Sequence, residues 1–270
     1  MAGKKVFGLN QINPASHALE HKEAAKVAVF GLASDFGCQV QMTNIERELL
    51  DVLGMFELVY WQLVSSAPLP EDFDIAIIEG AVCTQEHVET LQWIRERAKV
   101  VIAIGACAVT GGIPGLARGN VDDFAKRVYG DVPASCGSMA SPRPVSDIIA
   151  VDFTVPGCPI EPLELVAVLQ RALMGGNPEA GGRSMCGDCR LNEDVCFFER
   201  GRICLGLVTR AGCGAPCIKL GYPCNGCRGL AASANLDSAR DIVAGYGLDV
   251  ADFDARLQIF NKAGQDSSRS

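Results

Sequence analysis

Thirteen cysteines occur among the 270 residues, and eight of them lie between Cys186 and Cys227. These eight form two groups of four, spaced C-x2-C-x6-C-x7-C and C-x3-C-x6-C-x2-C. Four thiolates in a short segment can hold a tetrahedral zinc ion or a [4Fe–4S] cluster. The first group is Cys186, Cys189, Cys196 and Cys204, and the second is Cys213, Cys217, Cys224 and Cys227.

Zinc and an iron–sulfur cluster are alternatives for either group taken alone. A zinc site usually has two paired C-x2-C knuckles, whereas each group here has one. The looser spacings suit a cube whose corners are reached from different directions. Disulfides are a third alternative, but no export signal is visible in residues 1–23, and cytoplasmic thiols stay reduced. The density of thiols therefore favours iron–sulfur clusters in a cytoplasmic protein.

A third set of candidate ligands is spread over the first 160 residues. Asp35 and Cys38 form a D-x2-C turn after one apolar run, and Cys107 and Cys158 each follow another. Ligands of open α/β sheets bind beyond the carboxyl ends of the strands. Glycines beside Cys107 and Cys158 would let the backbone approach a bulky cluster and donate N–H groups to its sulfides. We therefore expect these positions to converge on one site.

The elements that must position these ligands alternate along the chain. Near-continuous apolar runs predict buried parallel strands, and apolar residues at helical spacing predict helices between them. This alternation predicts an α/β fold with a flavodoxin-like, doubly wound parallel sheet. The expected strands are residues 26–33, 56–61, 73–79, 99–105 and 151–155, and the expected helices are residues 44–53, 85–97 and 161–174.

Composition divides the chain into four parts. Residues 1–24 form an N-terminal extension, and residues 25–176 form the flavodoxin-like domain. Glycine and proline mark a linker near residues 175–182. Residues 177–235 form a small cysteine-rich domain with little apolar periodicity, so we expect metal clusters rather than an ordinary core to organise it. Helical patterning returns in a C-terminal tail, residues 236–270.

Charge and missing motifs exclude several functions. The net charge of −8 argues against nucleic acid and anionic membrane surfaces as partners. No apolar run approaches the length of a membrane span. The chain has no GxxxxGK[ST] motif, and no GxGxxG follows the first expected strand, so nucleotide binding is disfavoured.

Taken together, the motifs resemble the small subunit of [NiFe] hydrogenases from residue 26 to about residue 229. The resemblance rests on the D-x2-C turn, on Glu79-Gly-Ala, on Gly-Ala-Cys107-Ala-Val-Thr-Gly-Gly-Ile and on Pro-Gly-Cys158-Pro. The cysteine-rich end is similar to that of the cytosolic, multi-subunit members, which include F420-reducing, viologen-reducing and NAD(P)-linked enzymes. It carries C-L-G-L-V-T-R-A-G-C from Cys204 and P-C-N-G-C from Pro223.

The resemblance implies an electron-transfer subunit with three iron–sulfur clusters of the [4Fe–4S] type and no catalytic residue of its own. Hydrogen would react at a Ni–Fe centre in a separate large subunit, and electrons would pass to a further flavin or iron–sulfur subunit. By position, the ligands fall into a proximal set (Asp35, Cys38, Cys107, Cys158), a medial set (Cys213, Cys217, Cys224, Cys227) and a distal set (Cys186, Cys189, Cys196, Cys204).

Three positions depart from patterns known in this family. The respiratory enzymes have histidine at the Cys186 position and proline at the Cys217 position, so the fourth medial thiolate here implies a four-iron cluster. Asp35 replaces the first cysteine of the usual C-x2-C turn. Either its carboxylate ligates iron, or it lies beside a [3Fe–4S] cluster held by three cysteines; the first alternative is favoured.

The remaining candidates have simpler interpretations. Glu79 is either a buried partner at the proximal face, near the large-subunit interface, or a cap for the turn that follows it. We expect Cys83 to be a core residue and Cys136 a loop thiol. The three histidines, His17, His21 and His87, have no ligand-like spacing and are expected at the surface. Two rival functions remain: an electron-transfer subunit of a complex-I-like or sulfur-metabolising assembly, and a zinc-stabilised scaffold.

Overall fold

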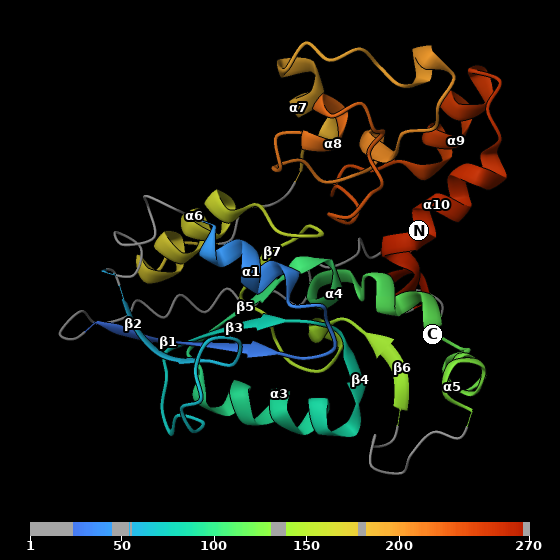
Figure 1. Ribbon diagram of the computed structural model, residues 1–270. Helices are drawn as coiled ribbons and strands as arrows, with labels where there is room; N and C mark the ends of the chain where they lie inside the picture. The colour runs from blue at the N-terminus through green and yellow to red at the C-terminus, as the bar shows by residue number, and fades with distance from the viewer. Residues whose placement is uncertain (1–23, 45–53, 55, 131–138, 178–181, 267–270) are drawn as a thin grey trace, which may run out of the picture.

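Five parallel strands form the central sheet of the computed structural model, which describes residues 24–44, 54, 56–130, 139–177 and 182–266 (Figure 1). The strand order is β2-β1-β3-β5-β7. Because β4 lies outside this sheet, the order by succession is 2-1-3-4-5, which is the flavodoxin-like arrangement that the sequence predicts. The strands are β1 (Ala25–Gly31), β2 (Phe56–Trp61), β3 (Ile75–Glu79), β5 (Val100–Ile104) and β7 (Phe153–Val155).

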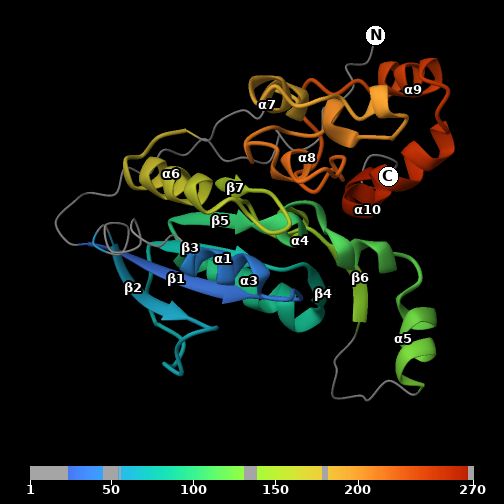
Figure 2. The ribbon, with the colours of Figure 1, turned by 45° about the horizontal axis from the view of Figure 1, so that its top comes forward.

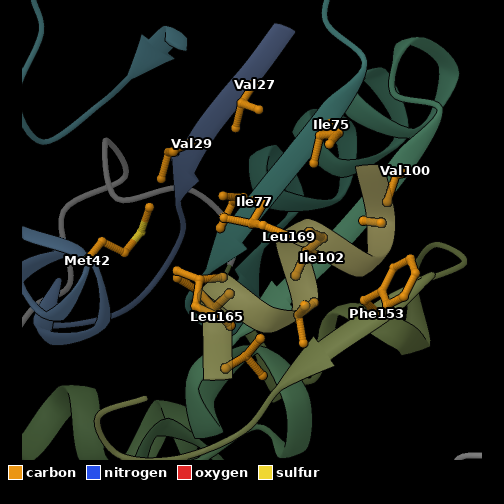
Figure 3. Close-up of a cluster of buried hydrophobic side chains, with 14 of the residues drawn as sticks. Val27, Val29, Met42, Ile75, Ile77, Val100, Ile102, Phe153, Leu165 and Leu169 are labelled. Carbon is orange, nitrogen blue, oxygen red and sulfur yellow. The ribbon is translucent and has the colours of Figure 1, made fainter. Parts of the chain in front are cut away.

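Helices cover both faces of the sheet. On one face, α3 (Gln85–Arg97) buries Leu91 and Ile94. On the other face lie α1 (Gly37–Thr43) and α6 (Pro162–Leu173). Figure 3 shows Leu165 and Leu169 of α6 among the valine and isoleucine side chains of the strands. Each such side chain stabilises the fold by about 1.5–3 kcal/mol when fully buried.

The predicted strands and helices are confirmed wherever the structure describes them, and several further elements are present, among them the helices α4 (Gly105–Thr110) and α5 (Val121–Tyr129). The D-x2-C turn continues directly into α1, which the sequence analysis did not anticipate. A small antiparallel ribbon of β4 (Val82–Thr84) and β6 (Met139–Arg143) was also missed, because both strands are short. The expected helix over residues 44–53 and the extension over residues 1–24 lie almost wholly outside the described residues.

The cysteine-rich segment does have a hydrophobic core, so the expectation that clusters alone would organise it is wrong. It contains the short helices α7 (Met185–Leu191) and α8 (Pro216–Lys219). Its apolar side chains pack against those of α9 (Leu236–Gly245) and α10 (Val250–Asp266). The buried members include Met185, Phe197, Leu205, Val208, Ile218, Val243, Phe253 and Leu257.

Helix α10 also reaches the flavodoxin-like part of the chain. Figures 1 and 2 show it running from the cysteine-rich segment to α4 (Gly105–Thr110). It also contacts the short 3-10 helix η1 (Ile113–Ala117), where Lys262 Nζ donates to the Leu116 carbonyl over 3.0 Å. One helix therefore packs against both parts. No helix among the described residues is long and apolar enough to cross a membrane.

Candidate metal centres

The proximal set lies at the carboxyl ends of three strands of the sheet, β1, β5 and β7. Asp35 and Cys38 follow β1, Cys107 lies on α4 directly after β5, and Cys158 follows β7. Glu79 is the last residue of β3, between β1 and β5. The open parallel sheet thus brings together residues more than a hundred positions apart, as the sequence predicts.

Gly105 leaves the space that this convergence requires. Its φ of +81° suits glycine, and a Cβ there would lie 2.5 Å from Cys38 Sγ. The next residue, Ala106, donates its N–H to the Gly157 carbonyl over 2.6 Å. The backbone beside Cys107 is therefore held against the loop that carries Cys158.

Glu79 holds the start of α1 in place. Its side chain is buried, and its carboxylate accepts from the backbone N–H groups of Cys38 (3.0 Å) and Gln39 (3.3 Å). Burial raises the pKa of this carboxyl. Of the two roles left open by the sequence, the structure supports a buried partner of the proximal set, since the carboxylate caps the helix that carries Cys38 rather than the turn after Glu79.

Asp35 is exposed at the edge of the same site. Its Oδ1 accepts from the Gly37 N–H over 2.9 Å. Burial, followed by the negative charge of Asp35, raises the pKa of Cys158. Burial and the charges of Cys158 and Asp35 raise the pKa of Cys107 to about 11. The Asp35 carboxylate is therefore near enough for its charge to act on two thiols of the proximal set, and its role as an iron ligand stays a prediction.

The distal set gathers around α7. Cys186 and Cys189 lie on this helix, and Cys196 and Cys204 lie on the chain that follows. Burial, with the added charges of Cys204, Cys189 and Cys196, raises the pKa of Cys186 to about 11. All four members of the first cysteine group therefore share one site, and Cys186 and Cys196 are exposed there.

The medial set lines a cavity of about 90 Å³. This volume is several times the roughly 10–15 Å³ that one water molecule needs. All four medial cysteines are in its wall, together with Cys158 of the proximal set and Phe260 of α10. Among the described residues, no three histidine, cysteine, aspartate or glutamate side chains lie close enough together to hold a single metal ion. The four medial cysteines thus line a space several times larger than a water molecule.

One shared cavity wall and one N–H···S hydrogen bond connect the three sets in series. Cys158, a proximal residue, lies with Cys227 of the medial set in the wall of the medial cavity. The backbone N–H of Cys224, a medial residue, donates to Cys204 Sγ in the distal set over 3.3 Å. The spatial order is thus proximal, medial, distal.

The electrostatics of the thiols suit a positively charged group. Burial and neighbouring thiols raise the pKa of Cys224 to about 12 and that of Cys227 to about 11. Such thiols are protonated at neutral pH, and they become good ligands only when a cation compensates the charge of the thiolates. All twelve cysteines in the described part of the chain are free. Cluster binding would therefore release protons.

Two buried charged residues beside these sets were not anticipated. Asp188 lies inside the C-x2-C turn of α7 and accepts from Arg183 Nη2 (2.7 Å) and from the Gly212 N–H (2.9 Å). Arg228 follows Cys227 and is also buried. Neither residue carries a local sequence signal of burial; only its position beside a cysteine ligand could have indicated it.

Of the residues outside the three ligand sets, Cys83 lies where the sequence predicts and His87 does not. Cys83 is buried in the core, as expected. The expectation for His87 is wrong, because the ring is half-buried and its Nδ1 accepts from the Cys83 N–H over 3.2 Å. The N-cap of α3, formed by Thr84, turns His87 back toward Cys83. Cys136, His17 and His21 lie outside the described residues.

Comparison with known proteins agrees with this geometry. Residues 36–172 match the family described as NADH ubiquinone oxidoreductase, 20 Kd subunit. The chain belongs to this family. The match begins just before Cys38 and ends within α6, so it covers the three cysteines of the proximal set.

Relatives that share most of their length with this chain are hydrogenase subunits. Sulfhydrogenase 2 subunit delta of Pyrococcus furiosus is 34% identical over 219 residues, which are 81% of this chain and 92% of that protein. A subunit of the F420-non-reducing hydrogenase vhu of Methanocaldococcus jannaschii is 32% identical, over 88% of this chain and 94% of that protein. The resemblance to hydrogenase small subunits is therefore confirmed.

A solved structure of similar fold is that of an NAD+-reducing [NiFe]-hydrogenase in the H2-reduced state. Its matching chain is 27% identical, with a TM-score of 0.54. The match covers 95% of that chain but 58% of this one. The chain is therefore a hydrogenase-type subunit, since the relatives that match most of its length are named as hydrogenase subunits.

Proposed function

We propose that this chain relays electrons between the Ni–Fe centre of a hydrogenase large subunit and a downstream flavin or iron–sulfur subunit. Its proximal, medial and distal sets would each hold one cluster of the [4Fe–4S] type, with Asp35 as the fourth proximal ligand. When bound, such clusters carry single electrons. The chain's own residues supply the thiolates, the N–H groups that bond to sulfur, and the order of the sites.

The continuity of the three sets is the observation that carries this proposal. A chain that merely needed structural metals would have no reason to place them in line. Here Cys158 of the proximal set lies with Cys227 in the wall of the medial cavity, and the backbone N–H of Cys224 in the medial set donates to Cys204 Sγ in the distal set. Residues exposed in part lie at both ends of the series, Cys158 at one and Cys186 and Cys196 at the other. Both ends could therefore meet a partner.

The extent of the matches bears on the class of acceptor. The delta subunit of the NAD-reducing HoxS hydrogenase matches 57% of this chain, whereas the vhu hydrogenase subunit matches 88%. The F420-non-reducing and sulfhydrogenase relatives thus match a larger share of this chain. This favours an acceptor subunit of their kind over one that reduces NAD directly.

A complex-I-like function is compatible with the family match, but the relatives that match most of this chain are named as hydrogenase subunits. The family description refers to NADH ubiquinone oxidoreductase, so the family match alone does not separate the two functions. The curated relatives that match over most of this chain are named as hydrogenase subunits. Hydrogen chemistry is accordingly the favoured function.

Hydrogen-dependent dye reduction tests the proposal. The native complex would be purified anaerobically through a tag on this chain and supplied with hydrogen and a viologen dye. We expect reduction by the wild type and its loss in Cys38→Ser and Cys158→Ser. Cys83→Ala is the matched control, since Cys83 is buried but belongs to no set. A brown wild-type complex that retains a large partner and reduces no dye would favour the complex-I-like rival.

A further inference from the structure

Arg228 has the most heavily bonded side chain near the candidate ligands. It follows Cys227 directly, and its side chain is 1% exposed. Its guanidinium makes five hydrogen bonds: Nη1 and Nη2 to the two Glu164 carboxylate oxygens (both 2.7 Å), Nη1 to the Pro156 carbonyl (2.8 Å), and Nε to the Arg210 and Ala211 carbonyls (both 3.2 Å).

These partners come from both parts of the chain. Glu164 lies on α6, and Pro156 lies two residues before Cys158, so both belong to the flavodoxin-like part. The Arg210 and Ala211 carbonyls lie on the segment that leads to Cys213. A single side chain thus contacts the approaches to a proximal ligand, Cys158, and to two medial ligands, Cys213 and Cys227.

The surrounding backbone leaves room for this guanidinium. Gly212 has a φ of +122°, and a Cβ there would lie 2.7 Å from Arg228 Nη2 and 3.4 Å from Glu164 Oε1. A buried ion pair usually gives little net stability over apolar residues of the same volume, because both charges lose their hydration. What a two-pronged Arg–carboxylate contact provides is a fixed geometry.

We propose that the Arg228–Glu164 pair is a positioning device that fixes the separation of the proximal and medial cysteine sets, and with it the rate of electron transfer between their clusters. This inference rests on the proposed relay function. The pair holds in register the approach of Cys158 to Cys227, since both residues line the medial cavity.

The pair also sets the charge beside the medial cavity. Arg228 lines that cavity, and the Glu164 carboxylate balances its positive charge. Neutralising Glu164 would leave the guanidinium unbalanced next to the medial thiolates. A positive charge there stabilises the reduced, more negative cluster, so the midpoint potential of the medial cluster should rise.

The test uses the intact complex with Arg228→Lys and Glu164→Gln. Arg228→Lys keeps the positive charge but loses the two-pronged contact of the guanidinium with the carboxylate. Glu164→Gln keeps the size and shape of the side chain but loses its negative charge. The control is Arg95→Lys, because Arg95 also bonds a buried carboxylate (Asp152, 2.7 Å) and three backbone carbonyls, but at the opposite ends of β5 and β7. The readouts are iron content, hydrogen–deuterium exchange by the complex, the rate of hydrogen-driven reduction of the medial cluster and its midpoint potential.

We expect both variants to keep wild-type iron content and isotope exchange, which needs no electron to leave the Ni–Fe centre. Medial reduction should slow by about 10- to 100-fold, the range typical of residues that support metal ligands. In Glu164→Gln the medial potential should also rise. Arg95→Lys should change none of these readouts.

Wild-type reduction rates and potentials in both variants would overturn the inference while leaving the relay intact. Loss of iron in Glu164→Gln, whose side chain is 20% exposed and tolerates change better than Arg228, would also overturn it, since the pair would then be needed for the fold alone. A wild-type complex without hydrogen-dependent reduction would instead contradict the proposed function.

Discussion

Asp35 brings an oxygen donor to a site that otherwise offers thiols. One carboxylate oxygen, Oδ1, accepts from the Gly37 N–H, and the charge of Asp35 acts on both Cys107 and Cys158. A carboxylate is a harder ligand than a thiolate, so an iron bound to it differs in potential from the other irons of the cluster. The identity of this one side chain therefore bears on how the proximal site binds its iron.

Replacing Asp35 distinguishes a proximal cluster that is ligated by the Asp35 carboxylate from a [3Fe–4S] cluster that is held by three cysteines. If Asp35 ligates iron, Asp35→Ala should convert the proximal cluster to a [3Fe–4S] form, seen as a new paramagnetic signal of the oxidised complex. Asp35→Cys should keep four irons with an altered potential. A three-iron signal already present in the oxidised wild type, unchanged by Asp35→Ala, would show that the carboxylate is not a ligand.

His87 makes the stability of the flavodoxin-like part depend on pH. Burial lowers its pKa, and its neutral Nδ1 accepts from the Cys83 N–H. A lowered pKa stabilises the fold above the unfolded value of about 6.5, and this contribution is lost as pH falls through the folded value. Between pH 7.5 and 5.5, the wild type should therefore lose more thermal stability than His87→Gln, measured anaerobically. Equal losses would contradict this role.

The functional residues that could be predicted from the sequence were those whose spacing forms a recognisable pattern. The twelve candidate ligands follow from cysteine spacing, the ends of apolar runs and family motifs, and the structure brings each set together. Arg228, Asp188 and the partial burial of His87 could not be predicted. A buried charge depends on partners such as Glu164, 64 positions away, and nothing in the local sequence marks such a partner.

At the scale of elements, the proximal set depends on how closely strand ends can approach one another. Glu79 at the end of β3 fixes the start of α1, and Gly105 at the end of β5 leaves space for Cys38 Sγ. The sheet was predictable because its strands lie in near-continuous apolar runs. The β4–β6 ribbon was not, since β6 reads Met-Ala-Ser-Pro-Arg, which is not an apolar run and contains proline.

Gly105→Ala, compared with a control glycine, separates two effects of an added Cβ: strain in the backbone and a clash with Cys38 Sγ. Gly119 is the matched control, because its φ of +80° equals that of Gly105 within a degree, yet a Cβ there would meet nothing within 4 Å. Both alanine variants should lose about 1–2 kcal/mol from the strained backbone. Only Gly105→Ala should also displace Cys38 and lower the iron content of the proximal site. Equal iron content in the two variants would show that Cys38 can move aside freely.

At the scale of the molecule, two cores share one bridging helix. The flavodoxin-like core was predictable from strand and helix periodicity. The second core was not, because its apolar residues come from irregular segments around the cysteines and from α9 and α10, which are far apart in the sequence. Helix α10 contributes Phe253 and Leu257 to this core and contacts α4 and η1 near its other end.

Phe253→Ala should destabilise the cysteine-rich part by about 3–5 kcal/mol, since the ring is fully buried. The expected signs are faster proteolysis of residues after 182 and loss of medial and distal iron, while the proximal cluster is retained. Phe124→Ala on α5 (Val121–Tyr129), where the ring is 42% exposed, should have little effect. Simultaneous loss of all three clusters would show that the two cores unfold as one unit.

The position of Phe260 has a consequence for biosynthesis. This ring forms part of the wall of the medial cavity, yet it lies 33 residues after the last ligand, Cys227. During translation, every candidate cysteine ligand is therefore synthesised before Phe260, the residue that completes the wall of the medial cavity. Until α10 emerges and docks, the medial thiols stay open on that side, which gives a cluster-delivery protein an interval in which to load them.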